Sequence, residues 1–458
     1  MYYRLCDKYS LRGFSGGREC FLLNNNNGIH HFLPKYIFDV LLMCNGKVDF
    51  SLPGFSSDIH KILIYSENKR IIMPCKQGEN LLPYQEYKET DIRHISEATW
   101  SVTGRCNLQC KHCFQGAPNK RIHDLSTEEA LKVIDILGEN FITRVNLTGG
   151  EPFVRPDIEE LLAAFKRNHI KLCMISSNGV LLNERIISLF EKYDMQPSFQ
   201  ISFDGVGCHD WLRGVPGTEE KVIRAIKLCG ENDIKVIMAT CLHKDNLYSL
   251  DDTVKLAESL GCVAIKINPV TAFNNYSNEN GVRLLSQDEV YNAYLSYLPR
   301  FVESNLNICL DFGDFIRVHG KKPGEYVIPL MQHNCMNLDT NRVCQIVMDN
   351  IYISDTGRVM PCIRLSESSA EDKFEKITET GVDSFSSEAF TEFMSISVRD
   401  VVNNNEECID CKYLPYCGCG CRGVAASDGS LYGKEEDRCA FFKGEWAKQI
   451  DKVMEPYK

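Results

Sequence analysis

Three cysteines close together in the sequence, Cys106, Cys110 and Cys113, have the residue type and spacing to hold a metal centre. They follow an apolar run at residues 98–102 that predicts a β-strand, so they should lie on the loop after it. Thiolates that converge on one centre are typical ligands of iron–sulfur clusters and of zinc. In a chain with 22 cysteines, the spacing alone leaves open an iron–sulfur cluster, part of a zinc site or three unrelated thiols.

The spacing C-x3-C-x2-C resembles the signature of radical SAM enzymes, and the three cysteines match it position by position. In that family, three thiolates hold three irons of a 4Fe–4S cluster and leave the fourth iron open. S-adenosylmethionine binds the open iron and is cleaved to a 5′-deoxyadenosyl radical. The resemblance therefore implies that these three cysteines are the catalytic cluster ligands.

A second motif, Gly149-Gly150-Glu151, follows the next predicted strand. Paired glycines allow the backbone to approach a ligand closely, and a carboxylate can pair with an ammonium group. A Gly-Gly turn alone says little. One βα unit after the cysteine loop, it resembles the GGE motif with which the family holds the amino group of S-adenosylmethionine.

Polar side chains after the third and fourth predicted strands resemble positions that the family uses for the ribose and carboxylate of S-adenosylmethionine. They are Ser176, Asn178, Ser202 and Asp204. Each of them alone is equally compatible with a turn. Arg213 resembles an arginine near the S-adenosylmethionine carboxylate, with a structural salt bridge as the alternative. The resemblance also places adenine contacts in the loop at residues 268–271.

The elements that position these motifs alternate between strands and helices, which is typical of a parallel sheet. The predicted strands are residues 98–102, 144–147, 171–175, 199–203, 236–241 and 263–267. The predicted helices include residues 158–166, 184–191, 219–228 and 253–260, and a capping box at Ser126 begins another. Six such units resemble the partial (β/α)6 TIM-type barrel of radical SAM proteins. We therefore predict an α/β fold with this core over residues 93–312 and an active site at the strand ends.

The first part of the chain, residues 1–92, predicts a separate small domain. A turn at Asn24–Gly28 separates two short strands. One apolar helix face is predicted from Leu33, Tyr36, Ile37, Val40, Leu41 and Leu42. Strands and helices in this order are winged-helix-like. The segment resembles the RiPP recognition element of radical SAM peptide maturases, which binds a precursor's leader as an added strand. A structural cap is the alternative.

Seven cysteines near the C-terminus match the SPASM domain pattern, which in relatives holds two auxiliary 4Fe–4S clusters. The resemblance implies that Cys344, Cys362 and Cys421 bind the first cluster and that Cys408, Cys411, Cys417 and Cys439 bind the second. A pair of zinc ribbons is the alternative. We assign residues 313–458 to a bridging region and this domain.

Two other cysteines in this region have different expectations. Cys335 is placed to be the fourth ligand of the first auxiliary cluster. If it binds, that cluster is closed and suits electron transfer; if it does not, one iron is free for a substrate thiolate. Cys419 fits no ligand position and is expected to be a spare thiol.

Composition and charge argue against several other classes of protein. The formal net charge of −11 disfavours a nucleic-acid interface, because the chain has no basic excess to neutralise phosphates. No apolar run is long enough to span a bilayer, and no secretory signal begins the sequence. We therefore expect a cytoplasmic protein without a membrane partner, whose cysteines serve metal clusters rather than disulfides.

The combined resemblance implies an enzyme that modifies a ribosomally synthesised precursor peptide bound through its leader. Our first expectation is a thioether crosslink of the sactipeptide or ranthipeptide type, with S-adenosylmethionine, three 4Fe–4S clusters and an electron donor such as flavodoxin or ferredoxin. Carbon–carbon or carbon–oxygen crosslinking and formylglycine formation in a sulfatase are the alternatives. A non-catalytic iron–sulfur peptide-binding protein would leave an S-adenosylmethionine site without a use.

Overall fold

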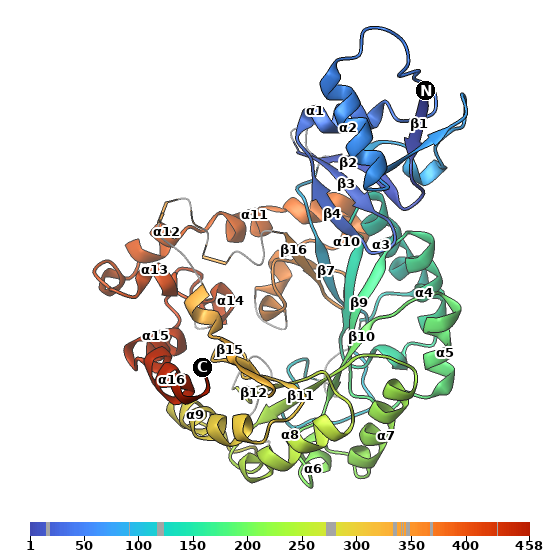
Figure 1. Ribbon diagram of the computed structural model, residues 1–458. Helices are drawn as coiled ribbons and strands as arrows, with labels where there is room; N and C mark the ends of the chain where they lie inside the picture. Colours follow the sequence, from blue (N-terminus) through green and yellow to red (C-terminus); the bar gives the residue numbers. More distant parts are fainter. Residues whose placement is uncertain are drawn as a thin grey trace.

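The structure of the 458-residue chain is a computed structural model. It describes all residues except 15–18, 91, 117–122, 272–280, 333–336, 340, 342, 345–348, 367–369 and 428. Figure 1 shows a curved sheet with helices outside it, an N-terminal lobe at one side and a C-terminal helical region at the other.

A mainly parallel sheet forms the centre of the molecule, and all six predicted strands are confirmed within it. They are β7 (Glu97–Ser101), β8 (Arg144–Thr148), β9 (Lys171–Ser177), β10 (Ser198–Ser202), β11 (Val236–Leu242) and β12 (Ala264–Pro269). Each pairs in parallel with its sequence neighbour. The sheet also extends beyond the prediction, because β13 (Cys309–Asp311) pairs in parallel with β12 and β16 (Asn350–Ile353) with β7.

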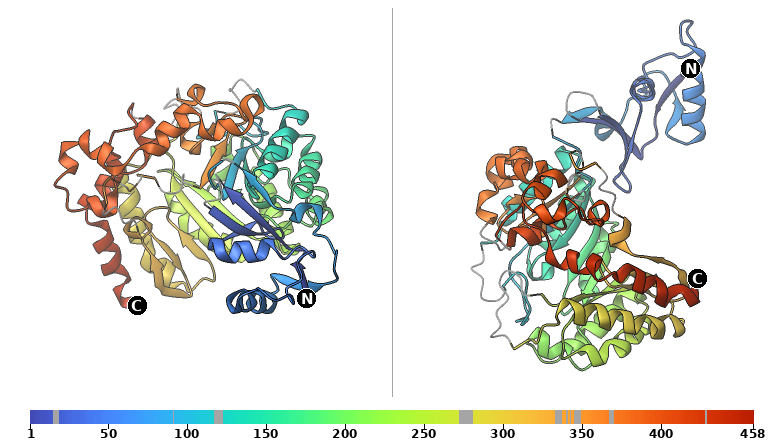
Figure 2. Two further views of the ribbon diagram at one scale, coloured as in Figure 1. Left: turned by 90° about the horizontal axis from the view of Figure 1, so that it is seen from above. Right: turned by 90° about the vertical axis from the view of Figure 1, so that its left-hand side faces the viewer.

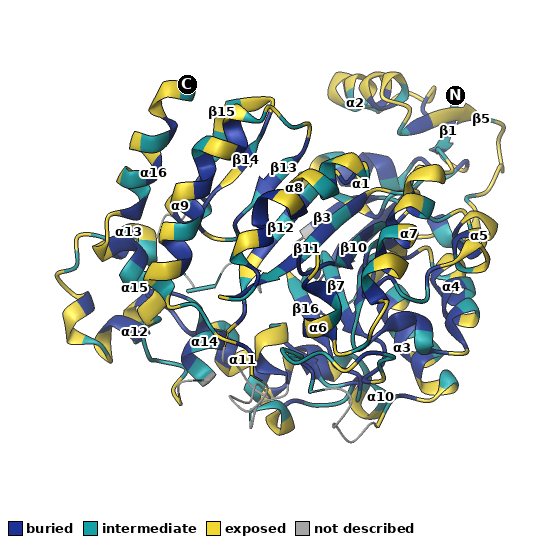
Figure 3. Cartoon of the chain, turned by 90° about the horizontal axis from the view of Figure 1, so that it is seen from below, coloured by how far each residue is buried: buried dark blue, intermediate teal, exposed yellow. Residues whose placement is uncertain are grey.

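Helices cover the outer face of this sheet (Figure 1). They are α3 (Thr127–Glu139), α4 (Ile158–Arg167), α5 (Glu184–Lys192), α6 (His209–Arg213), α7 (Thr218–Glu231) and α8 (Leu250–Ser259). The predicted capping box at Ser126 is confirmed, since its hydroxyl accepts from Glu129 N–H and its own N–H donates to the Glu129 carboxylate. Figure 3 shows buried residues along the strands and exposed residues on the outer helix faces.

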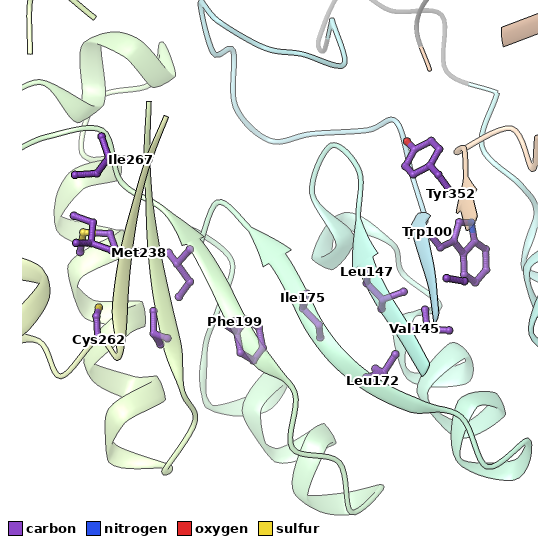
Figure 4. Packing of buried hydrophobic residues seen from close by; sticks show 14 of the residues in the cluster. Trp100, Val145, Leu147, Leu172, Ile175, Phe199, Met238, Cys262, Ile267 and Tyr352 are labelled. Atoms are coloured by element: carbon purple, nitrogen blue, oxygen red, sulfur yellow. The ribbon is translucent and has the colours of Figure 1, made fainter. Parts of the chain in front are cut away.

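The core lies between the strands and these helices, where alternate strand residues point outward. Figure 4 shows Val145, Leu147, Ile175 and Phe199 projecting from neighbouring strands into this layer, and all four are fully buried or nearly so. Because these residues face the helices, the other face of each strand, and its C-terminal end, are left for the site.

The N-terminal lobe has two small sheets and its own apolar core. One sheet has the order β4-β3-β2-β6 and the other pairs β1 with β5. The elements are β1 (Tyr2–Leu5), β2 (Tyr9–Phe14), β3 (Glu19–Asn24), β4 (Ile29–Phe32), α1 (Lys35–Leu42), α2 (Ser57–Asn68), β5 (Ile72–Cys75) and β6 (Lys88–Thr90). Figure 2 shows this lobe projecting away from the barrel.

The hairpin around the Asn24–Gly28 turn is confirmed. The placement of Tyr36 on the buried face of α1 is wrong, since it is 64% exposed, but Val40 and Leu41 are buried as predicted and Phe38 joins them.

The C-terminal region contains more helix than the sequence indicated. After β13 come β14 (Arg317–His319) and β15 (Lys322–Val327), which are antiparallel. A hairpin of β16 and β17 (Val359–Met360) follows, as expected around Gly357. The helices are α9 (Gln287–Glu303), α10 (Ile377–Thr380), α11 (Glu388–Ser395), α12 (Val398–Asn403), α13 (Leu414–Cys417), α14 (Arg422–Ser427), α15 (Glu436–Lys443) and α16 (Trp446–Met454). Because α16 packs on α9, where Trp446 lies 5.2 Å from the ring of Tyr291, the end of the chain is tied to the barrel.

Across the described ranges, we find no helix with the length and apolarity that a bilayer crossing requires.

An aromatic junction joins the N-terminal lobe to the barrel. His30 on β4 lies 4.7 Å from Phe21 and 4.9 Å from His94 between ring centroids, and Phe14 lies 6.3 Å from Phe141 of the barrel. Burial, reinforced by the nearby His94, lowers the pKa of His30 to about 3. His30 is therefore neutral in the folded protein throughout the physiological range.

We predict that this histidine makes the fold acid-sensitive. Unfolded His30 takes up a proton below pH 6.5, but folded His30 does so only near pH 3, so its stabilisation is complete above pH 6.5 and is lost as the pH falls toward 3. At pH 5 the loss is up to about 2 kcal/mol. Thermal unfolding at pH 7 and pH 5 should show a smaller pH effect in His30→Leu than in the wild type. His60→Leu, at an exposed position on α2, is the control; identical pH effects in His30→Leu and wild type would contradict the assignment.

Candidate active site

A cavity of about 360 Å³ lies at the C-terminal ends of the parallel strands. The thiols of Cys106, Cys110 and Cys113 line one side of it, and Gly149 and Gly150 line another. Ser176, Asn178, Ser202, Arg213 and the loop at 268–271 complete the wall together with other strand-end residues. The structure thus brings together three predicted cluster ligands and most of the residues predicted to contact S-adenosylmethionine.

The sulfur atoms of the cysteine loop receive hydrogen bonds from three different elements. Cys106 Sγ accepts from Leu108 N–H at 3.4 Å and from Asn178 Nδ2 at 3.7 Å, and Cys110 Sγ accepts from Arg213 Nη1 at 3.7 Å. Burial raises the pKa of the Cys106 thiol to about 11, and the neighbouring Cys110 adds to this effect. A thiol with so high a pKa becomes a thiolate at neutral pH only when a metal takes the place of its proton. Donors aimed at sulfur fit a metal–thiolate centre.

The glycines of the second motif pack directly on the cysteine loop. Gly150 N–H donates to Thr103 O at 2.8 Å, and Glu151 N–H donates to Arg105 O at 2.8 Å. A Cβ on Gly150 would lie 2.1 Å from Arg105 O, so no other residue fits at this position. The two motifs therefore form one unit held by backbone hydrogen bonds.

Glu151 is placed differently from the expectation that its carboxylate meets an ammonium group. The side chain is 0% exposed, and its oxygens accept from Ser177 Oγ at 3.0 Å and from Asn178 N–H at 2.7 Å. Burial raises the pKa of Glu151 to about 7, against the lowering effect of these donors. Since Asn178 in turn reaches Cys106, Glu151 positions Asn178. Sequence reasoning missed Ser177, whose only signal was its place at the end of a predicted strand.

Asp204 and Arg213 form a buried ion pair, with Arg213 Nε 2.5 Å from Asp204 Oδ2. Asp204 is 0% exposed and also accepts from Cys241 N–H at 3.0 Å. Burial acts against its charged form, but Arg213, His112 and His209 together lower the pKa of Asp204 to about 2. This geometry fits the structural salt bridge that was the alternative for Arg213, although Arg213 also lines the cavity and its Nη1 lies 3.7 Å from Cys110 Sγ.

Interactions among the C-terminal cysteines are compatible with the two sets that the SPASM resemblance implies, and the role of these thiols as cluster ligands stays a prediction. Burial raises the pKa of the Cys362 thiol to about 11, and the nearby thiols of Cys421 and Cys344 add to this effect. Burial raises the pKa of the Cys417 thiol to about 12, and the nearby thiols of Cys439 and Cys408 add to this effect. In the same way, Cys411 contributes to the raised pKa of Cys408. Cys419 is buried beside Cys408 and shares a hydrogen bond with it, so it lies closer to the second set than a spare thiol requires. Cys335 lies outside the described residues.

The spacing of these cysteines can be compared with that of a zinc site. Within the described ranges, only His112, Asp204 and Cys241 form a trio of candidate ligand atoms within 4.8 Å of one another. Tetrahedral zinc holds its sulfurs about 3.8 Å apart, given Zn–S bonds of about 2.3 Å. No set of three described cysteines has all its sulfur atoms within 4.8 Å of one another, so the geometry does not single out a zinc ion. Arg213 already pairs with Asp204 in the compact trio, which explains that trio without a metal.

Comparison with known proteins adds to this geometry. Residues 100–257 match the model of the radical SAM superfamily. The AdoMet-dependent heme synthase of Oleidesulfovibrio alaskensis is 27% identical over 349 residues, covering 75% of this chain and 86% of that protein. The antilisterial bacteriocin subtilosin biosynthesis protein AlbA of Bacillus subtilis is 27% identical over 267 residues, covering 58% of this chain and 54% of that protein.

Among solved structures, Streptococcus suis SuiB bound to precursor peptide SuiA has a similar fold. The TM-score is 0.65 at 15% identity, and the match covers 95% of this chain and 99% of that one. Residues 100–257 therefore match the radical SAM superfamily, and the chain is an enzyme whose relatives include proteins named as a bacteriocin biosynthesis protein and as heme synthases.

Proposed function

We propose that the chain is a peptide maturase that installs a thioether crosslink in a ribosomally synthesised precursor. The observation that carries this proposal is the meeting of Cys106, Cys110 and Cys113 at one cavity, in a chain whose C-terminal cysteines gather in two further sets. AlbA, a bacteriocin biosynthesis protein, and SuiB, solved with its precursor peptide, support a peptide substrate.

The residues of the cavity have distinct roles in this proposal. The three cysteines would hold a 4Fe–4S cluster, and Gly149 and Gly150 would lie against S-adenosylmethionine. When bound, the two cofactors supply a 5′-deoxyadenosyl radical that removes a hydrogen atom from the substrate. Asn178 and Arg213 donate to the sulfurs and stabilise their negative charge. The cavity wall orients the reactants and excludes water.

The remaining parts of the chain supply the peptide and the electrons. The N-terminal lobe, as a leader-binding element, would bring the precursor to the barrel. The two C-terminal cysteine sets would hold auxiliary 4Fe–4S clusters that pass electrons or bind a substrate sulfur, with a flavodoxin or ferredoxin as donor. We place this activity in the cytoplasm.

A second candidate function is tetrapyrrole chemistry, because the heme synthase relative matches 75% of this chain. The N-terminal lobe supports the peptide, since it has its own apolar core and an exposed sheet edge at β4. Carbon–carbon or carbon–oxygen crosslinking and formylglycine formation share the same cavity and differ only in the product.

Substitution of one cluster ligand tests the cavity assignment. We expect Cys106→Ala to abolish reductive cleavage of S-adenosylmethionine, because the cluster then lacks one of its three anchors. Chromatographic measurement of 5′-deoxyadenosine under anaerobic reducing conditions checks this. Cys173→Ala, a half-buried thiol earlier on β9, is the control and should retain cleavage. Undiminished 5′-deoxyadenosine from Cys106→Ala would refute the assignment.

The metal content tests the C-terminal sets. We predict about twelve irons per reconstituted chain, as three 4Fe–4S clusters require. Cys411→Ala should lower this to about eight, because one auxiliary cluster loses a ligand. Cys419→Ala, from the same loop, should keep about twelve if that thiol is spare. About four irons with bound zinc in the wild type would show that the C-terminal cysteines hold zinc instead.

Mass spectrometry of a candidate precursor, a short peptide encoded beside the gene and coexpressed with this chain, tests the product. Loss of two hydrogens with one thiol blocked to alkylation is expected for a thioether. Loss of two hydrogens with every thiol still free would point to a different crosslink, and an unmodified peptide beside a consumed porphyrin would favour the tetrapyrrole function.

A further inference from the structure

A second cavity, of about 510 Å³, lies between the barrel and the C-terminal cysteine region. It shares Phe114, Asn268, Pro269 and Thr271 with the cavity at the cysteine loop. Its far wall includes Arg364, two residues after Cys362, and Arg438, next to Cys439. The second cavity therefore adjoins the cavity of the cysteine loop on one side and residues near Cys362 and Cys439 on the other.

Aromatic rings form much of the barrel side of the second cavity. Tyr294 stacks on Phe312 at 3.9 Å between centroids, and Tyr291 stacks on Phe315 at 5.0 Å. Tyr294 is anchored further because its hydroxyl donates to Ile267 O at 3.1 Å. Such stacked and anchored rings give a rigid apolar wall against which a side chain can pack.

Cations of this cavity are mostly paired within the protein. Arg438 lies 3.3 Å from Glu435 and 3.7 Å from Asp314, and Arg317 lies 3.2 Å from Asp311. Lys266 differs. It lines the cavity from the middle of β12, in register with Ala239 of β11 and Asp311 of β13. Its ammonium group makes no hydrogen bond or ion pair within the described ranges, since Asp311 pairs with Arg317.

A partly buried ammonium group without a partner loses hydration and gains nothing in return. Lys266 is half-buried on a strand, where its backbone is fixed by neighbours on both sides. A substrate carboxylate would supply the missing charge, since charge-assisted hydrogen bonds are the strong ones.

We infer that Lys266 binds the carboxylate of an aspartate or glutamate in the modified segment of the peptide, and so selects which residue lies next to the radical. This inference rests on the proposed function and names part of its substrate specificity. The carboxylate head would meet Lys266 while the rest of the segment packs on the aromatic wall.

The test compares Lys266→Gln, Lys266→Arg and wild type, with Lys322→Gln as the matched control. Lys322 lies on β15 in the same sheet, is 65% exposed in its side chain and pairs with Glu325 at the surface. The candidate precursor encoded beside the gene is the probe, and mass spectrometry gives modified peptide per 5′-deoxyadenosine formed. Iron content and the absorbance spectrum show whether each variant is folded and loaded.

We expect Lys266→Gln to lower this ratio about 10- to 100-fold, as the loss of a charged hydrogen bond does. Lys266→Arg should keep most of it, because the charge remains, and Lys322→Gln should match the wild type. In the precursor, one Asp→Asn or Glu→Gln change in the modified segment should cause the same loss, and combining it with Lys266→Gln should add little.

Equal ratios in wild type and Lys266→Gln, additive losses or a modified segment without a carboxylate would each overturn the inference. An inactive Lys266→Arg that still binds the precursor would overturn it in favour of a general base, since arginine cannot give up its proton. Iron coproporphyrin III that binds wild type but not Lys266→Gln in an absorbance titration would overturn the peptide as the source of the carboxylate. A wild-type protein that leaves every candidate peptide unmodified would contradict the proposed function itself, and the inference with it.

Discussion

Two backbone hydrogen bonds, from Gly150 to Thr103 and from Glu151 to Arg105, hold the cysteine loop over the ends of the parallel strands. Side-chain ligands on a loop are useful only if the loop has one conformation, because a cluster needs its thiolates at fixed positions. The missing Cβ of Gly150 makes the close approach sterically allowed. The position of the three thiols thus depends on a glycine about forty residues away in the sequence.

Two buried acidic side chains reinforce this arrangement, and each of them accepts hydrogen bonds. Glu151 is held by Ser177 and Asn178, and Asp204 is held by Arg213. Buried charges are tolerated when they are paired and hydrogen-bonded, and removing one partner is then strongly destabilising. In both cases the outer partner, Asn178 or Arg213, extends to a cysteine sulfur. The buried carboxyl groups of Glu151 and Asp204 therefore orient the donors that face the cluster ligands.

The sequence predicted the repeated parts of the molecule best. All six parallel strands and the capping box at Ser126 were predictable because hydrophobic periodicity and local hydrogen bonding are short-range properties. The addition of β13 and β16 to the sheet was not predictable, since strand pairing across 253 residues, as from Ser96 to Asp349, leaves no local pattern. The exposure of Tyr36 was missed for a similar reason, because which side of a short helix is covered depends on its neighbours.

In the site, residue types and spacing were enough to name the cysteines and the glycine motif. They were not enough to distinguish a side chain that lines the cavity from one that lies behind it. Glu151 and Asp204 were both expected to face the ligand, and both lie fully buried behind residues that do. The role inferred for Lys266 could not be predicted from the sequence, because the sequence does not show which residues surround a lysine in a strand.

The most direct test of the central claim, that three thiolates leave one iron open for S-adenosylmethionine, is electron–nuclear double resonance of the reduced protein. The ligand carries nitrogen-15 in its amino group and oxygen-17 in its carboxylate. We predict hyperfine couplings to both labels, which require both groups to bind the cluster. A cluster spectrum that S-adenosylmethionine leaves unchanged, without coupling to either label, would contradict the assignment of Cys106, Cys110 and Cys113.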